Sequence, residues 1–485
     1  MEPKAKGDVM KNETQASNRR GRFILTAGLL LGTITIGLIM KLQAADGTHI
    51  SGWSRASSGV VSLQARADRT AVLQGDDGNV RLELILTAAE VEGRRVSVPT
   101  DLLVILDRSG SMQGEKLEQG RAAIRELIRQ LGAKDRFALV TYSYEAELTI
   151  ALERATQAAK TSWESQLQEI YADGGTNMSH GLDVAYETLG HARDELRASR
   201  IILISDGLAN HGDASEQGLI QRAARFSQRE QVLSAVGVGL DFNEFLMSKL
   251  ADAGTGNYYF VEQTSGLAKV FANEFNASRN TVASAVSVTL APGPRVEVVD
   301  VAGYPLERKD GRVTFRPGTL FSGQERRVWV TYRVPTSSIA EFELGAITVD
   351  YRSGGERYAV ALEDSAQVAC VYNEESYFAG VDKEAWERSV VEESYGRLRE
   401  VVARAVSEGR RDEAKAEINA YRQQQERMNE KLKSTLVEQN LVEVEELEAQ
   451  VDDSFQGADQ ALKRNRFSKT NQADALKMRR SGSKN

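Results

Sequence analysis

The strongest constraint on the fold is a pair of apolar runs that each end on an aspartate. "LLVILD", residues 102–107, and "RIILISD", residues 200–206, contain almost no polar side chain before that carboxylate. Such a run is typical of a strand buried on both faces of a parallel sheet. Amphipathic segments such as "KLEQGRAAIRELIRQLG" separate the strands between residues 102 and 278. The alternation predicts an α/β fold with a doubly wound, mainly parallel sheet and helices on both faces, over residues 99–278.

The residues on either side of this segment have a different period. Polar and apolar residues alternate in residues 66–98 and again in residues 279–372, where turn signals such as Asp310-Gly311 separate short runs. This pattern is typical of antiparallel strands. It predicts one β-sandwich into which the α/β domain is inserted, and two unrelated β segments are the alternative.

The last quarter of the chain is rich in charge. Residues 384–455 predict a charged helical region, with "SEGRRD" as the turn of a helical hairpin. Residues 463–485 carry eight Lys or Arg and one Asp. They predict a disordered basic tail, either solvated or in contact with an anionic surface.

The amino-terminal part predicts a membrane span. Residues 23–40, "FILTAGLLLGTITIGLIM", are uncharged and follow a basic segment, residues 1–22. That length is sufficient for a transmembrane helix, and the preceding positive charge favours a cytoplasmic amino end. Residues 41–65, which include "SGWSRASSGVVS", predict a linker. We therefore expect a single-pass signal-anchor with the bulk of the chain outside the cytoplasm (the periplasm), and secretion after signal cleavage is the alternative.

Composition excludes several classes of protein. The chain has 485 residues, of which 41% are hydrophobic and 27% charged, as in ordinary globular proteins of more than one domain. A net charge of −8 argues against nucleic-acid binding by the chain as a whole. The single cysteine, Cys370, excludes an internal disulfide and a Cys/His zinc site, and we expect it to be a small buried hydrophobe.

Oxygen-bearing side chains follow the predicted strands. Asp107, Ser109 and Ser111 come directly after one strand, Asp206 ends another, and Thr176 begins a helix after two glycines. In a doubly wound sheet the carboxyl ends of the strands form the ligand-binding edge. This set of hard oxygen donors suits Mg²⁺, Mn²⁺ or Ca²⁺ and disfavours zinc and copper. Two carboxylates leave a divalent cation under-neutralised, so the ion would readily accept a carboxylate from a partner.

These motifs carry a resemblance to a known family. "DRSGSM", "DGGTN" and "LISDG", in that order, resemble the metal-ion-dependent adhesion site of von Willebrand factor type A domains. The resemblance implies that Asp107, Ser109, Ser111, Thr176 and Asp206 are the metal ligands, with Mg²⁺ as the ion. The surrounding sandwich and the amino-terminal span are similar to membrane-attached bacterial members of that family.

The same residues allow other interpretations. Met112 stands where an EF-hand loop needs glycine, and neither a phosphate-binding loop nor a G-x-S-x-G elbow is present. Metal-assisted hydrolysis would need a general base, for which His180 is the nearest candidate, although a packing role is the alternative. Asp173 is either an outer ligand or a turn-forming residue. A metal-free, vestigial site also stays open.

Three functions follow from this sequence. The first is a non-enzymatic module that binds a protein partner through the cation, in adhesion or scaffolding. The second is an assembly or maturation factor that works with an ATPase, with the charged helices as the contact surface. The third is a metal-dependent hydrolase.

Overall fold

The α/β domain, the sandwich and the helical region are all seen in a computed structural model, which describes residues 53–90, 99–190, 197–263, 266–363 and 366–480. The predicted segments 1–22 and 23–40, and the first part of the predicted linker, lie outside these residues. None of the helices within the described ranges is both long and apolar enough to cross a bilayer.

The α/β domain is built on a six-stranded mixed sheet in the order β10-β9-β8-β5-β6-β7, in which only β7 runs antiparallel to its neighbour. The strands are β5 (Thr100–Asp107), β6 (Arg136–Tyr142), β7 (Ala146–Arg154), β8 (Ala198–Ser205), β9 (Gln231–Val238) and β10 (Thr255–Val261). The chain adds β6 on one side of β5 and β8 on the other. The winding direction therefore reverses at β5, which places a ligand-binding crevice beyond its carboxyl end. The predicted fold class is confirmed.

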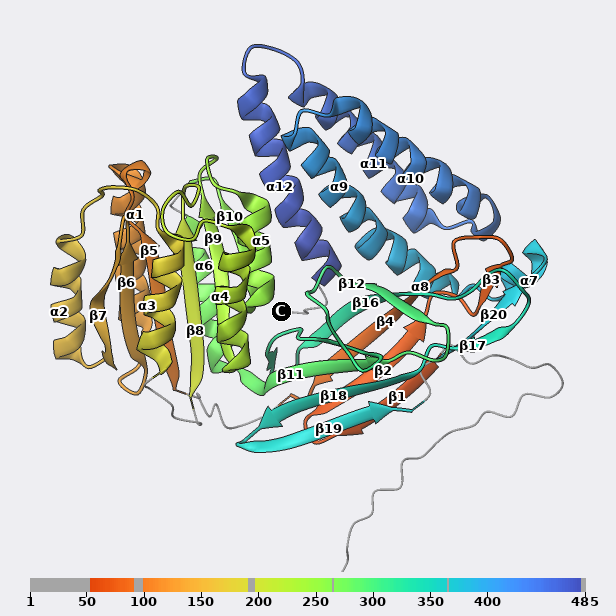
Figure 1. The fold of residues 1–485 in the computed structure, drawn as a ribbon, viewed down its shortest axis with the longest axis horizontal. Helices are drawn as coiled ribbons and strands as arrows, with labels where there is room; N and C mark the ends of the chain where they lie inside the picture. Colours follow the sequence, from red (N-terminus) through yellow and green to blue (C-terminus); the bar gives the residue numbers. More distant parts are fainter. Residues whose placement is uncertain (1–52, 91–98, 191–196, 264–265, 364–365, 481–485) are drawn as a thin grey trace, which may run out of the picture. The chain divides into compact units, whose positions relative to one another are not determined.

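Helices cover both faces of this sheet (Figure 1). Leu102, Val104 and Leu106 of β5 point into a core shared with α1, α2 and α6, whereas Leu103 and Ile105 point into a core shared with α3, α4 and α5. This explains why the whole of β5 is apolar. The helices are α1 (Glu115–Gln130), α2 (Gln157–Gln168), α3 (Met178–Gly190), α4 (Glu216–Gln228), α5 (Glu244–Ala253) and α6 (Leu267–Arg279).

The β segments before and after the α/β domain form one sandwich. β4 (Asn79–Ala88) pairs antiparallel with β16 (Glu325–Arg333), so strands from both ends share a sheet, in the order β1-β2-β4-β16-β12. The second sheet has the order β13-β14-β11-β18-β19, with β15 against β11, and a small third sheet has the order β17-β20-β3. The predicted insertion is therefore confirmed. The remaining strands are β1 (Trp53–Ser58), β2 (Val61–Ala67), β3 (Ala71–Leu73), β11 (Thr281–Ala291), β12 (Glu297–Val301), β13 (Glu307–Lys309), β14 (Arg312–Phe315), β15 (Leu320–Phe321), β17 (Glu341–Glu343), β18 (Ala346–Ser353), β19 (Glu356–Leu362) and β20 (Gln367–Val371).

The predicted linker, residues 41–65, needs a correction. Its second half forms β1 and most of β2, which pair with each other and extend the first sheet. Val61, Leu63 and Ala65 are buried on the sandwich face, while the residues between them are partly exposed. The serine and glycine content obscured this alternation. Cys370 is buried in β20, as expected.

The carboxyl-terminal region is a set of helices, and the loop between α9 and α10 is the predicted hairpin turn. The prediction of disorder for residues 463–485 is wrong as far as residue 480, because α12 continues to that point. Phe467 and Ala475 of α12 are buried, and Lys469 and Arg479 are paired with glutamates. The helices are α7 (Glu374–Ala379), α8 (Lys383–Arg388), a π-helical turn (Ser389–Ser394), α9 (Tyr395–Ser407), α10 (Arg411–Leu432), α11 (Thr435–Ser454) and α12 (Gln460–Arg480).

Candidate functional site

Asp107 is the last residue of β5, and its carboxylate is fully buried at the point where the winding reverses. The backbone N–H of Ser109 donates to Oδ1 at 2.8 Å, and the Ser205 hydroxyl donates to Oδ2 at 2.8 Å. The Tyr142 hydroxyl also donates to Oδ2, at 3.2 Å. Burial raises the pKa of Asp107 to about 6, although the bonds from Ser109 and Ser205 act in the opposite direction.

The other four predicted oxygen residues lie beside Asp107. The hydroxyls of Ser109 and Ser111 are 3.0 Å apart, and Ser111 donates to Asp206 Oδ1 at 2.7 Å. Thr176 belongs to the same group. A Cβ added at Gly207 would lie 3.4 Å from Ser111 Oγ and 3.9 Å from Thr176 Oγ1, so both hydroxyls lie beside this glycine. The structure thus brings together all five side chains that the sequence singled out. We call them the oxygen cluster.

Backbone hydrogen bonds hold the loops of the cluster in place. The N–H of Gly110 donates to the carbonyl of Gly174 at 3.1 Å, and the N–H of Asp173 donates to the carbonyl of Arg108 at 2.8 Å. Gly174 has a φ of 75°, which a residue with a side chain rarely adopts. Asp173 itself is exposed at this turn. Its predicted role as an outer ligand stays a prediction.

Lys116 of α1 provides a countercharge that the sequence analysis did not anticipate. Its ammonium lies 2.5 Å from Asp206 Oδ2. Asp206 is fully buried, whereas the Lys116 side chain is about one-third exposed. A cation that enters the oxygen cluster would therefore compete with an ammonium for one of the two carboxylates. The position of Lys116, the second residue of α1, was visible in the sequence, but its partner was not.

The donor chemistry of the cluster fits a hard divalent cation. It supplies two carboxylates and three hydroxyls, all oxygen, and no sulfur or imidazole. Over the described ranges, no three or more His, Cys, Asp or Glu side chains are grouped so as to hold a metal ion. A metal bound here would therefore depend on the hydroxyls and on oxygen ligands from outside the chain.

The His180 ring is engaged in a hydrogen bond within the domain. Its Nδ1 accepts a hydrogen bond from the backbone N–H of Ala146 at 2.9 Å. The ring thereby ties α3 to the start of β7, and its Nδ1 lone pair is already used. This arrangement supports the packing role for His180.

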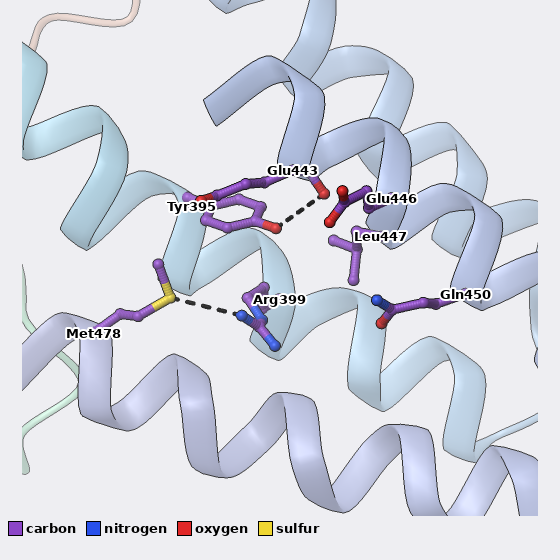
Figure 2. Close-up of a pocket in the computed structure, with 7 residues that line it drawn as sticks. All are labelled: Tyr395, Arg399, Glu443, Glu446, Leu447, Gln450 and Met478. Atoms are coloured by element: carbon purple, nitrogen blue, oxygen red, sulfur yellow. Dashed lines mark hydrogen bonds between the residues drawn. The ribbon is translucent and has the colours of Figure 1, made fainter. Parts of the chain in front are cut away.

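The structure also contains a pocket of about 280 Å³ among α9, α11 and α12, shown in Figure 2. The Tyr395 hydroxyl donates to the carbonyl of Glu443, and the Arg399 guanidinium lies 2.7 Å from the Asp474 carboxylate. Two of its polar lining residues, Tyr395 and Arg399, thus already have partners. The pocket shares no residue with the oxygen cluster.

Comparison with known proteins agrees with the fold of the α/β domain. Residues 101–273 match the family model described as the von Willebrand factor type A domain. The chain contains a von Willebrand factor type A domain. A solved structure described as von Willebrand factor type A from Catenulispora acidiphila superposes with a TM-score of 0.63 at 15% identity, covering 87% of this chain and 98% of that one. The ArnB paralog VWA2 from Sulfolobus acidocaldarius superposes with a TM-score of 0.51 at 17% identity, over 85% of this chain and 98% of that one. These likenesses establish the fold.

Curated relatives are similar over part of their length. The uncharacterized protein YfbK of Escherichia coli is 29% identical over 40% of this chain and 34% of its own length. The uncharacterized protein sll0103 of Synechocystis is 24% identical over 55% of this chain and 65% of its own. An inter-alpha-trypsin inhibitor heavy chain of Sus scrofa is 30% identical over 32% of this chain and 17% of its own. The chain therefore spans between about one-sixth and two-thirds of the relatives it matches.

Proposed function

We propose that this protein binds a protein partner through a divalent cation held by its von Willebrand factor type A domain, in adhesion or scaffolding rather than in catalysis. The observation that carries the proposal is the oxygen cluster at the carboxyl end of β5. Two buried carboxylates and three hydroxyls converge there from separate loops. Mg²⁺ is the proposed ion, with Mn²⁺ or Ca²⁺ as substitutes.

The charge of the cluster explains why a partner would be needed. By formal charge Asp107 and Asp206 would balance a divalent cation, so the under-neutralisation expected from the sequence depends on Lys116, which already offsets part of the charge on Asp206. The three hydroxyls bind the ion without adding negative charge. An acidic side chain of the partner would therefore supply both the missing charge and the missing ligand.

The binding domain is proposed to be displayed outside the cytoplasm. The uncharged run at residues 23–40 and the basic segment before it support a membrane anchor with a cytoplasmic amino end. An alkaline phosphatase fused after Asn485 should be active in bacterial cells, since this enzyme folds only after export. An inactive fusion together with an active cytoplasmic reporter at the same site would instead favour the assembly factor that works with an ATPase.

Titration calorimetry of Mn²⁺ with the full-length chain in detergent tests the cation site. Asp107→Asn keeps the size of the side chain but removes a ligand charge, so we expect Mn²⁺ binding to fall at least about tenfold. Asp350→Asn, which neutralises an exposed carboxylate on β18 of the sandwich, is the matched control and should bind as the wild type does. Equal Mn²⁺ binding by the wild type and by Asp107→Asn would refute the proposed site.

A further inference from the structure

Three large apolar side chains stand exposed around the oxygen cluster. Tyr144 is 56% exposed, Tyr171 69% and Leu208 58%. Each lies on a different loop at the carboxyl edge of the sheet: after β6, before Asp173, and directly after Gly207. We call these three residues the apolar rim.

Contacts connect the two tyrosines of the rim to the loops that carry the oxygen cluster. The ring of Tyr144 lies against Gly174, where an added Cβ would be 2.5 Å from it, and packs edge-on against His211 at 4.6 Å. The guanidinium of Arg108 lies 5.8 Å from the ring centre of Tyr171. The two tyrosines thus contact the loops of the cluster while most of each side chain stays exposed, and Leu208 directly follows Gly207 in the chain.

A pocket opens beside the rim at Arg108. It has a volume of about 240 Å³ and is lined by Arg108, Glu147, Ile170 and Tyr171 among others. Arg108 Nε is buried and has no hydrogen-bond partner among the described residues. The Arg108 guanidinium lies 3.6 Å from Glu147, whose carboxylate is mostly exposed. The unpaired Nε is enclosed by the protein, so a segment that enters this pocket would meet its outer lining, which includes the Glu147 carboxylate and the ring of Tyr171.

We infer that the apolar rim and the Arg108 pocket select the partner, as a protein segment in which one Asp or Glu is flanked by large apolar side chains. The acidic group would approach the cation, and the apolar neighbours would cover Tyr144, Tyr171 and Leu208. Exposed Tyr side chains around a central polar anchor are typical of protein interfaces.

Charge favours a protein segment over a membrane surface. Glu147 and Glu169 line the pocket beside Tyr171 and would repel an anionic headgroup layer. An isolated carboxylate flanked by apolar side chains avoids this repulsion, because its one charge is directed to the cation. The inference rests on the proposed cation site, and it adds which partner that site accepts.

Phage-displayed random peptides, selected on the full-length chain in detergent with Mg²⁺, provide the probe. Peptides eluted with EDTA should carry an Asp or Glu with Leu, Phe, Tyr or Trp beside it. The triple variant Tyr144→Ser/Tyr171→Ser/Leu208→Ser should bind a synthetic copy of the best peptide at least about tenfold more weakly. Its Mn²⁺ binding in calorimetry should equal that of the wild type.

The control variant Ile339→Ser/Tyr372→Ser removes two apolar side chains outside the von Willebrand factor type A domain, which are 63% and 74% exposed. It should bind the peptide as the wild type does. Unchanged peptide affinity in the triple variant, or selected peptides without the acidic and apolar pattern, would overturn the inference while leaving the cation site intact. Rim-dependent sedimentation with phosphatidylglycerol vesicles would overturn it in favour of a membrane contact. If the wild type does not bind Mn²⁺ at all, the proposed function itself is refuted.

Discussion

At the scale of single residues, the Asp107 carboxylate is buried, and desolvation disfavours its charged form. Burial is the main reason that its pKa rises from 3.8 to about 6, and the hydrogen bonds from Ser109 and Ser205 compensate only in part. The folded chain without metal therefore holds the proton more tightly than the unfolded chain. The stabilising effect of this proton is fully present below pH 3.8 and is lost as the pH rises through about 6.

This shift predicts a pH-dependent effect of Asp107→Asn in EDTA. The difference between 3.8 and about 6 corresponds to about 3 kcal/mol, so the variant should become more stable than the wild type by up to that amount between about pH 4 and pH 7. Urea unfolding of both proteins at a series of pH values measures the difference, in which all other titrating groups cancel. A difference that does not change with pH would contradict the burial argument. Added Mg²⁺ should stabilise the wild type and not the variant.

Replacement of Lys116 should raise the affinity for the cation, whereas Asp107→Asn should lower it. Replacement by Met removes a positive charge 2.5 Å from Asp206 and keeps most of the aliphatic chain. We expect Lys116→Met to bind Mn²⁺ about fivefold more tightly, since the side chain is partly exposed and its repulsion of the ion is screened to about 1 kcal/mol. Calorimetry at low and high salt should show the gain shrinking with salt. Lys309→Met on β13 is the control, and weaker binding by Lys116→Met would show that the ammonium supports the site.

The five oxygen residues were predictable because each follows a local signal, such as the end of an apolar run or a pair of glycines. Their supporting residues were not. Tyr142 and Ser205 reach Asp107 only because β6 and β8 both pair with β5, and this strand order is a property of the whole sheet. Lys116 was missed because a lysine at the start of a helix is usually solvated.

At the scale of elements, the long apolar strands were the safest predictions and the polar segments the least safe. β7 and α2 were not anticipated, because β7 is a half-exposed edge strand and its alternation is irregular. β1 was hidden in a serine-rich stretch that looked like a linker. α12 was hidden by its net positive charge, since composition alone cannot show that Lys469 and Arg479 find buried acidic partners. The partners of α12 are distant in the sequence, whereas β7 pairs with β6 and β1 with β2, each its neighbour in the chain.

At the scale of the whole molecule, the carboxyl-terminal helices are tied to the von Willebrand factor type A domain by buried charge. Lys469 of α12 lies 2.7 Å from Glu244 at the start of α5, and both side chains are almost fully buried. Ser468 donates to the same carboxylate at 2.6 Å, and Lys469 also donates to the carbonyl of Phe242 at 2.7 Å. A segment that looked like a charged tail therefore supplies the partner of a buried acid more than two hundred residues earlier in the chain.

The buried ion pair between Lys469 and Glu244 leads to a prediction about the stability of the protein. Lys469→Met leaves the Glu244 carboxylate buried without its cation, so thermal and urea unfolding should show a loss of about 3–5 kcal/mol. Lys469→Met combined with Glu244→Gln removes both charges and should recover most of that loss, which a double-mutant cycle separates from packing effects. Arg466→Met breaks the more exposed ion pair of α12 with Glu262 and, as the control, should lower the stability by less than about 1 kcal/mol. If Lys469→Met is no more destabilising than Arg466→Met, the buried pair does not hold α12 to the domain.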